Sequence, residues 1–264
     1  MRPGCSLPFL EETQNEPASD RAHSKNVNPP TERPLSPEPA LTGSAAHGAF
    51  DIRPVEERDL AFLVDMHLRQ FPNGFYAQLG PAFKTRYFRQ YFRSPGAIGL
   101  VAEQRDGSGL VGYLIGTVDD GAHDRFMHRS ASLALTAAGS SALAARPSLW
   151  SSFIRQRARW YARRFVSGMV RSRRPSAEPH QGELLYICTG QGNRRRGIGA
   201  ALLRSYVEEA QRAHAEGLHL VSERDNTAAH EFYAHRGWRV ISESVTRDGR
   251  PLVKMTLSLS GSTE

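Results

Sequence analysis

Cysteine and lysine are scarce in this chain of 264 residues. It has two cysteines, Cys5 and Cys188, and three lysines against 31 arginines. Two cysteines in unrelated contexts exclude a disulfide framework and a cysteine metal cluster, and they suit a reducing cytosol. No apolar run approaches the length of a membrane span, so no transmembrane helix is expected. We therefore expect a cytoplasmic protein without a metal site.

The rest of the composition is globular, with glycine and arginine concentrated in one place. The chain is 39% apolar and 23% charged, which is typical of a folded domain. An apolar run over 184–188 predicts a buried strand, and a turn rich in glycine and arginine follows at 189–199. Apolar residues at helical spacing from Ala201 onward predict a helix after the turn. This order favours an anion site, because the first N–H groups of a helix are unpaired and carry partial positive charge.

Two familiar phosphate-binding loops do not fit this turn. A P-loop requires Gly-x-x-x-x-Gly-Lys-Ser/Thr, and Gly192 and Gly197 have the glycine spacing. Ile198 and Gly199 then stand where the lysine and the hydroxyl belong. A dinucleotide fingerprint requires a third glycine where this chain has Arg195. The turn is therefore of another kind.

The remaining pattern, Arg194-x-x-Gly197-x-Gly199, resembles the (Arg/Gln)-x-x-Gly-x-(Gly/Ala) loop of the GNAT superfamily of acyl-CoA-dependent N-acyltransferases. A second segment strengthens the resemblance. The run Asn226-Thr-Ala-Ala-His-Glu-Phe-Tyr233-Ala-His-Arg-Gly-Trp is similar to the family pattern Asn-x-x-Ala-x-x-x-Tyr-x-x-x-Gly-(Phe/Trp). The resemblance covers residues 50–258, with its specific motifs between 183 and 238.

The resemblance implies an α/β fold with a mixed, mostly antiparallel central sheet flanked by helices. We expect one acetyltransferase domain over 49–260. A strand at 50–53, a helix from Asp59 and an aromatic-rich helix over 81–92 precede a predicted hairpin at 99–118. In the family the two helices border the acceptor pocket. We interpret the aromatic residues of the second helix as core packing.

Residues 1–48 differ in composition from the rest of the chain. They contain half of the 16 prolines and a single aromatic residue. Such a segment cannot bury enough apolar surface to offset the entropy lost on ordering. We expect a disordered N-terminal tail.

Residues 119–180 form an insert that a minimal GNAT domain lacks. The insert has eleven arginines and four acidic residues, and aromatic or apolar residues recur three to four positions apart between Trp150 and Met169. This spacing predicts a basic amphipathic helix. Its arginines could be solvated while the apolar face packs on the domain, or they could meet an anionic acceptor as part of a lid. The third alternative is peripheral membrane contact through 150–174. Nucleic acid is not an expected partner, because positive charge is the only feature that favours it and the sequence has no recognisable nucleic-acid-binding motif.

The resemblance implies acetyl-CoA as co-substrate and no metal. In the family the strand before the turn splays from its neighbour, and pantetheine fills the gap. Main-chain N–H groups of the turn would then bind the pyrophosphate, with arginine side chains adding charge-assisted contacts. The implied cofactor-binding residues are Ile187, Cys188, Thr189, Arg194, Arg195, Arg196, Gly197, Ile198, Gly199, Ala200 and Asn226.

Three of these assignments have particular features. We interpret the Cys188 thiol as buried and inert rather than nucleophilic. Asn226 is expected at the N-cap of the second-motif helix, where its side-chain oxygen would accept a backbone N–H. The family usually has a proline and an aromatic residue before the turn arginine, where this chain has Gln-Gly-Asn at 191–193.

The catalytic residues are also assigned by resemblance. Tyr233 matches the family tyrosine that points at the thioester sulfur and acts as general acid; core packing is the alternative. Glu183 begins the strand where many GNAT enzymes have a glutamate that acts as base, directly or through water; an exposed strand-end carboxylate is the alternative. Further candidates for the base are Glu223, His219 and His123.

The expected function is transfer of an acetyl group from acetyl-CoA to a primary amine of a small molecule or amino sugar, by direct attack. A protein or peptide N-terminus is the alternative acceptor. A different alternative is a non-catalytic acyl-CoA-binding module, associated with a membrane through the insert.

Overall fold

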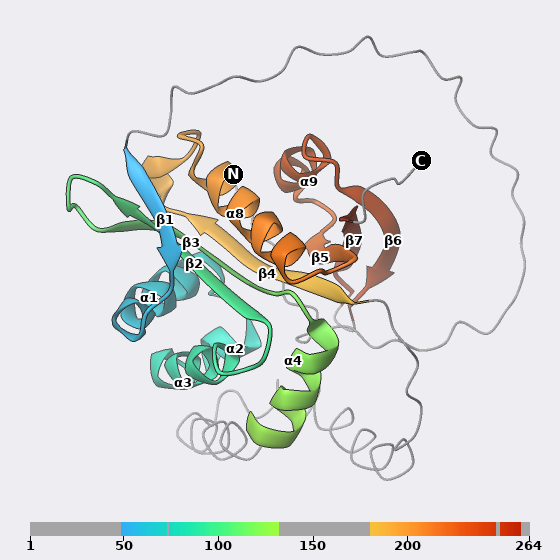
Figure 1. Cartoon of the computed structure of the whole chain (residues 1–264), viewed down its shortest axis with the longest axis horizontal. Coiled ribbons are helices and arrows are strands. Elements are labelled where there is room, and N and C mark those ends of the chain that lie inside the picture. Colours follow the sequence, from blue (N-terminus) through green and yellow to red (C-terminus); the bar gives the residue numbers. More distant parts are fainter. Residues whose placement is uncertain (1–48, 73, 132–179, 247–248, 260–264) are drawn as a thin grey trace, which may run out of the picture.

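The structure is a computed structural model that describes residues 49–72, 74–131, 180–246 and 249–259 (Figure 1). The expected tail over 1–48 and the basic helix over 150–174 lie outside these residues. The elements are β1 (Phe50–Pro54), η2 (Glu57–Asp59), α1 (Leu60–Gln70), α2 (Phe75–Gln78), α3 (Pro81–Tyr91), β2 (Ala97–Gln104), β3 (Leu110–Thr117), α4 (Asp120–Phe126), η3 (Met127–Ala131), β4 (Gln181–Thr189), η6 (Gln191–Asn193), α8 (Ile198–Arg212), β5 (Gly217–Glu223), α9 (Thr227–Ala234), β6 (Arg239–Val245) and β7 (Pro251–Ser258).

Seven strands form one sheet in the order β1-β2-β3-β4-β5-β7-β6. Every neighbouring pair is antiparallel except β4 and β5, which are parallel. The expected mixed, mostly antiparallel sheet is thus confirmed. α2 was not expected, because its four residues are too few to produce a helical repeat in the sequence.

Helices cover the two faces of the sheet separately. α8 crosses one face, and α1, α2 and α3 lie on the other (Figure 1). The α8 side has an apolar core drawn from every strand except β6, with Leu114, Leu184, Leu220 and Val253 among its members. The core on the opposite side consists mainly of α1, α3 and residues of β2, β3 and β4. The aromatic residues of α3 belong to it and are buried, as expected: Phe83, Tyr87, Phe88 and Tyr91.

Two glycines of β3 allow α8 to approach the sheet closely. A β-carbon at Gly116 would lie 2.9 Å from the ring of Tyr206, and one at Gly112 would lie 3.1 Å from Ile198. The Tyr206 hydroxyl donates a hydrogen bond of 2.7 Å to the carbonyl of Thr117. These contacts fix the axis of α8 on the sheet, and with it the position of the α8 N-terminus.

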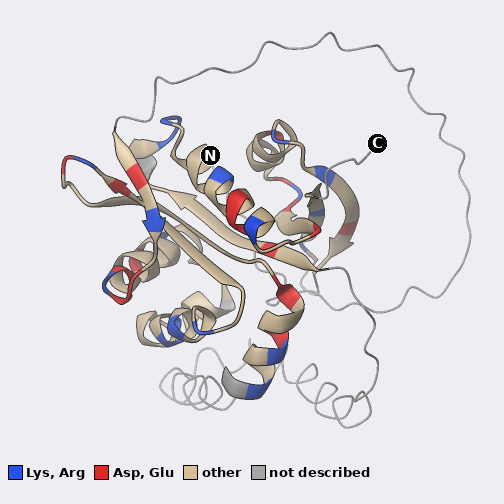
Figure 2. Cartoon of the chain, viewed as in Figure 1, with Lys and Arg blue, Asp and Glu red and all other residues tan. Residues whose placement is uncertain are grey.

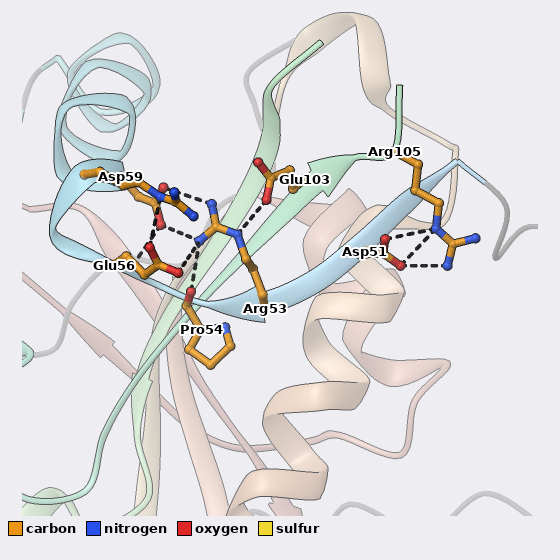
Figure 3. A network of polar contacts seen from close by, with 8 residues as sticks. Asp51, Arg53, Pro54, Glu56, Asp59, Glu103 and Arg105 are labelled. Carbon is orange, nitrogen blue, oxygen red and sulfur yellow. Dashed lines mark hydrogen bonds and ion pairs between the residues drawn. The ribbon is translucent and has the colours of Figure 1, made fainter. Parts of the chain in front are cut away.

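A polar network centred on Arg53 joins β1, β2 and the start of α1 (Figure 3). Its guanidinium donates at 2.6 and 3.0 Å to both oxygens of Asp59 and at 2.6 Å to Glu103. Asp59 is 4% exposed, and it also accepts the N–H of Glu56 at 2.9 Å. These donors stabilise the ionised form of the buried Asp59 carboxylate, and they are arranged around it only in the folded protein.

Replacing Arg53 with glutamine should lower the free energy of unfolding by about 2–3 kcal/mol, because it removes the charged partner of a buried carboxylate. Burial is the largest single influence on Asp59 and raises its pKa, but the hydrogen bonds from Arg53 and from the N–H of Glu56, together with the charges of Arg53 and Arg58, lower the pKa overall. A lowered native pKa stabilises the fold above about pH 4, and that contribution is lost as the pH falls through the native pKa. Urea unfolding should therefore show a difference between the two proteins that is constant near neutral pH and shrinks below about pH 4.

Arg58→Gln is the matched control, since Arg58 pairs with Glu56 on the surface and is 69% exposed. Its effect should stay within about 0.5 kcal/mol. Equal losses in the two variants would show that the Arg53 network contributes no more than a surface ion pair.

Candidate active site

The turn between β4 and α8 combines exposed arginines with left-handed backbone. η6 leads into Arg194, Arg195 and Arg196, all exposed. Arg195 has φ 61°, and Gly197, directly before α8, has φ 79°. In Figure 2 this turn is coloured blue where it enters α8. Positive charge thus surrounds the N-terminus of a 15-residue helix. Ile198, Gly199 and Ala200 supply the first backbone N–H groups of this helix, which can bind an anion.

The first turn of α8 meets both β4 and α9. A β-carbon at Gly199 would lie 3.7 Å from Phe232 of α9 and 4.0 Å from Thr189 at the end of β4. At Gly197 a β-carbon would meet no atom of the described residues within 4 Å, so the space beside this glycine is open. The helix that contains Tyr233 is therefore placed next to the predicted phosphate-binding turn.

β4 and β5 separate soon after they begin. Their pairing has three residue pairs, from Gln181 opposite Gly217 to Glu183 opposite His219. Beyond this point β4 continues to Thr189 along β3, while β5 continues to Glu223 along β7. The main chain of β4 beyond Glu183, which includes Ile187 and Thr189, is thus no longer paired with β5. The structure has the strand splay that the family resemblance implies.

Glu183 occupies the point where the two strands separate. It is 6% exposed, so the alternative of an exposed strand-end carboxylate is wrong. The pKa values of two buried phenols, Tyr91 and Tyr206, are raised well above their ordinary value, first by burial and second by the charge of Glu183. The carboxylate is therefore held in a buried environment close to aromatic hydroxyls.

His219 lies beside Glu183, because directly paired residues of neighbouring strands project on the same face of a sheet. It is 5% exposed, and its Nδ1 is 3.9 Å from Oδ2 of Asp120 at the start of α4. Burial, followed by the charge of Lys254 on β7, lowers the pKa of His219 to about 4. Burial raises the pKa of Asp120. At neutral pH the His219 imidazole is therefore neutral, and this contact is not an ion pair.

A second buried histidine lies on the same side of the sheet. His123 of α4 has Nδ1 2.5 Å from Oγ of Ser94, and its ring centroid is 4.3 Å from that of Tyr91. Burial, followed by the charge of His128, lowers the pKa of His123 to about 4. Nε2 of His123 and the hydroxyl of Tyr91 are both buried and have no hydrogen-bond partner among the residues that the structure describes. Both groups are uncharged at neutral pH.

Tyr233 is buried in the core on the α8 side, at 1% exposure. Its ring centroid lies 5.2 Å from that of Phe232 and 5.6 Å from that of Trp238. The ring thus packs in the core, as the alternative interpretation expected. Its helix nevertheless lies against the α8 N-terminus, so packing and a role at the cofactor are compatible.

The expected side-chain cap by Asn226 is wrong. Asn226 does stand at the N-cap of α9, but its side chain makes no capping hydrogen bond. Its main-chain carbonyl instead accepts the N–H groups of Ala229 and His230 at 3.0 and 3.1 Å. The side-chain amide donates to Oγ of Ser222 at 3.5 Å. Asn226 therefore links α9 to β5 across the turn.

Two further sequence expectations concern Cys188 and Glu223. Cys188 is 2% exposed in the core opposite α8, which confirms a buried thiol. Glu223 accepts a hydrogen bond of 2.8 Å from Arg250, so this candidate base is engaged in an ion pair at the end of β5. Burial in the core accounts for Cys188 and the ion pair accounts for Glu223, so neither residue needs a catalytic role to explain its position.

Lys84 was not singled out from the sequence. It is fully buried, and its Nζ lies 4.9, 4.8 and 5.0 Å from the ring centroids of Tyr87, Phe88 and Tyr186. Nζ is also 3.4 Å from the Tyr186 hydroxyl. The signal was present, since a lone lysine lies among the aromatic residues of 81–92. Lys84 thus places a cationic side chain against β4, on the sheet face that also bears Glu183.

Two classes of feature are not found in the part of the chain that the structure describes. No three His, Cys, Asp or Glu residues there are grouped as metal ligands would be. No described helix is both long and apolar enough to cross a membrane.

Solved structures with the same fold include a GCN5-related N-acetyltransferase from Kribbella flavida, at 16% identity and a TM-score of 0.51. That match covers 80% of this chain and 98% of the other. The proposed acetyltransferase yncA from Salmonella typhimurium, solved with its cofactor acetyl-CoA, matches at 14% identity and a TM-score of 0.50, over 82% of this chain and 97% of that one. A comparison with curated proteins gave no match. The structural likenesses show the fold.

The sequence itself supplies the family. The model of the Acetyltransferase (GNAT) family matches residues 60–238, which is more than half of the chain. The matched range contains the Arg194–Gly199 turn, the splayed strand β4 and the α9 motif with Tyr233. The chain therefore belongs to the GNAT acetyltransferase family and is an acyl-CoA-dependent N-acyltransferase.

Proposed function

We propose that this enzyme acetylates a primary amine of a small molecule or amino sugar by direct attack on acetyl-CoA. The observation that carries the proposal is the divergence of β4 from β5 at the buried Glu183. The divergence lies between the sheet face that α8 crosses and the opposite face, which α1 and α3 cover. Donor and acceptor can thus meet at the point where the strands part.

In this proposal acetyl-CoA lies along the free edge of β4. Its pyrophosphate accepts main-chain N–H groups from the turn and from the first residues of α8, where the helix dipole favours an anion. The exposed side chains of Arg194, Arg195 and Arg196 supply charge-assisted contacts. Pantetheine takes main-chain hydrogen bonds near Ile187 and Thr189 that β5 does not satisfy. Cys188 contributes through its backbone only, since its thiol is in the core.

The chemical step then requires three proton transfers. The acceptor ammonium loses a first proton to the Glu183 carboxylate, directly or through water, and its nitrogen lone pair attacks the thioester carbon. The C–N bond forms, and the attacking nitrogen loses its second proton to solvent. The C–S bond breaks, and the departing thiolate takes a proton from the Tyr233 phenol. The proton on Glu183 returns to solvent, from which the phenolate is reprotonated. Holding both substrates together makes a covalent enzyme intermediate unnecessary.

A peptide N-terminus is the alternative acceptor, and an anionic acceptor would suit the arginines of 119–180, most of which lie outside the described residues. We also propose a cytoplasmic location, with peripheral membrane contact through 150–174. A thiol-release assay with acetyl-CoA and a panel of small amines, amino sugars and peptides tests these choices. Release with none of them, together with tight acetyl-CoA binding, would favour the non-catalytic binding module.

Glu183→Gln should lower kcat/KM by about tenfold to a hundredfold near neutral pH, because the acceptor amine then lacks its base. The loss should shrink as the pH rises towards the pKa of the acceptor amine, since the free amine no longer needs the enzyme to remove its proton. Glu223→Gln is the matched control and should leave the pH profile unchanged. A Glu183→Gln loss that stays constant with pH would show that the carboxylate positions groups without acting as base.

A further inference from the structure

The proposed function leaves two buried polar atoms unused. They are the hydroxyl of Tyr91, at the end of α3, and Nε2 of His123, on α4. Neither atom has a hydrogen-bond partner within the described part of the chain, and the two residues are 0% and 2% exposed. Their ring centroids lie 4.3 Å apart, so both groups share one part of the core. Leaving these atoms without partners would cost at least as much stability as the loss of two hydrogen bonds.

This part of the core lies beside Glu183, which pairs with Thr117 at the end of β3. Oγ1 of Thr117 donates at 3.1 Å to the main-chain carbonyl two residues after Ser94. Oγ of Ser94 is in turn 2.5 Å from Nδ1 of His123. The pKa of Tyr91 is raised first by burial and second by the charge of Glu183, which has the largest influence of any charged group on this phenol. The two atoms therefore lie close to the proposed base.

Water is the partner that fits these groups. Buried polar atoms that no protein group satisfies are typically bonded to an ordered water, which makes about three hydrogen bonds. The Tyr91 hydroxyl, Nε2 of His123 and the Glu183 carboxylate together supply that number of partners. Because the hydroxyl and Nε2 are both fully buried, a single water fits this place better than part of an acceptor molecule does.

We propose that Tyr91 and His123 hold a water molecule against the carboxylate of Glu183, and that Glu183 removes the acceptor proton through this water. The inference rests on the proposed role of Glu183 as base. Since Glu183 is 6% exposed, a bridging water gives the acceptor amine a route to a carboxylate that lies below the surface. Tyr91 and His123 act through the water and are therefore positioning residues. His123 comes from α4, so the start of the 119–180 insert contributes to the site.

One arrangement of hydrogens satisfies every group. His123, whose pKa is lowered to about 4 by burial, is neutral, so one ring nitrogen donates and the other accepts. Nδ1–H donates to Oγ of Ser94, and Nε2 accepts from the water. The Tyr91 hydroxyl donates to the water, and the water donates its second hydrogen to Glu183. When an N–H bond of the acceptor ammonium breaks, its proton moves to the water oxygen and the water passes its own proton to Glu183, so the water is regenerated.

Tyr91→Phe tests the water through stability and through rate. If the hydroxyl binds a water, the variant loses a hydrogen bond and its melting temperature falls by about 2–4 °C. A dry hydroxyl predicts a rise instead, because the variant then removes an unsatisfied polar group. We expect kcat/KM for the acceptor to fall about three- to tenfold, with the acetyl-CoA dissociation constant unchanged. Tyr206→Phe is the control, since it also loses a buried hydroxyl, bonded to the Thr117 carbonyl, and should leave kcat/KM unchanged.

His123 offers a matched pair of variants. The amide of asparagine reaches the position of Nδ1 in histidine, whereas the amide of glutamine reaches that of Nε2. His123→Gln can therefore still contact the water, and His123→Asn can contact only Ser94. We expect His123→Gln to keep kcat/KM within about threefold of the wild type and His123→Asn to lose as much as Tyr91→Phe. The reverse order would give His123 a purely structural role through Ser94 and overturn the proposal.

Combining Tyr91→Phe with Glu183→Gln separates this inference from the proposed function. If the water serves Glu183, Tyr91→Phe causes no further loss of kcat/KM once the carboxylate is gone. Losses that add would show that Tyr91 acts elsewhere, and the proposal would be wrong. Full activity of Glu183→Gln alone would instead remove Glu183 as base, and the proton route with it. A higher melting temperature for Tyr91→Phe would overturn the water while leaving the role of Glu183 intact.

Discussion

Replacing Tyr233 with phenylalanine should lower kcat by about ten- to a thousand-fold while leaving the affinity for acetyl-CoA close to normal. The substitution removes one oxygen from a ring that is almost fully buried between Phe232 and Trp238. The apolar contacts of the ring remain, so α9 keeps its place against the first turn of α8. What is lost is the proton donor for the departing thiolate.

Single-turnover kinetics, with chemistry shown to be rate-limiting, are the appropriate measurement, since slow product release would hide the effect. Tyr206→Phe is a matched control. Tyr206 is also buried and donates its hydroxyl to the Thr117 carbonyl, so the variant should lose about 1 kcal/mol of stability with little change in kcat. Equal kcat values for Tyr233→Phe and the wild type would remove Tyr233 from the mechanism and leave its packing role.

Gly197→Val should abolish the rise in melting temperature that acetyl-CoA gives the wild type. A ligand present at a hundred times its dissociation constant stabilises a native protein by about 2.7 kcal/mol, which is several degrees for a domain of this size. Gly197 has φ 79°, a conformation that a β-branched residue adopts only at high cost. The valine would therefore distort the turn before α8 and place methyl groups where the phosphate approaches.

Gly192→Val separates the two causes of failure. Gly192 lies in the same turn, is exposed, and has open space beside it within 4 Å among the described residues. Its φ is not in the left-handed region. This variant should still be stabilised by acetyl-CoA, measured by thermal shift and confirmed by calorimetry. If Gly197→Val binds acetyl-CoA as tightly as the wild type, the pyrophosphate is bound elsewhere.

The sequence predicted the parts of the site that depend on local chain geometry. The turn from Arg194 to Gly199, the helix after it and the α9 motif have spacings that show in a single sequence. The mixed sheet followed from the family resemblance. α2 was missed because four residues show no period. The side-chain cap at Asn226 was wrong because the N-cap position fixes the backbone, whereas Ser222 on β5 competes for the side chain.

The residues around Glu183 could not be predicted from spacing in the sequence. His219 stands beside it only because of the register between β4 and β5, and Asp120 reaches His219 from a helix about a hundred residues earlier in the chain. Neither relation leaves a periodic or spacing signal. The burial of Lys84 is similar, since it depends on Tyr186 from β4 closing over α3. Pairings of this kind are tertiary and require the fold.

The short β4–β5 pairing also has a mechanical consequence. Three residue pairs join a four-stranded part of the sheet, β1 to β4, to a three-stranded part made of β5, β7 and β6. On the α8 side both parts share one apolar core, whereas the opposite core contains no described residue of β5, β6 or β7. The joint is therefore stiff on one face and compliant on the other, where polar groups such as His219 and Asp120 bridge it. A change in the angle between the two parts of the sheet would open the gap between β4 and β5 on the face opposite α8, while α8 stays packed on both parts. The sheet itself can therefore act as a hinge.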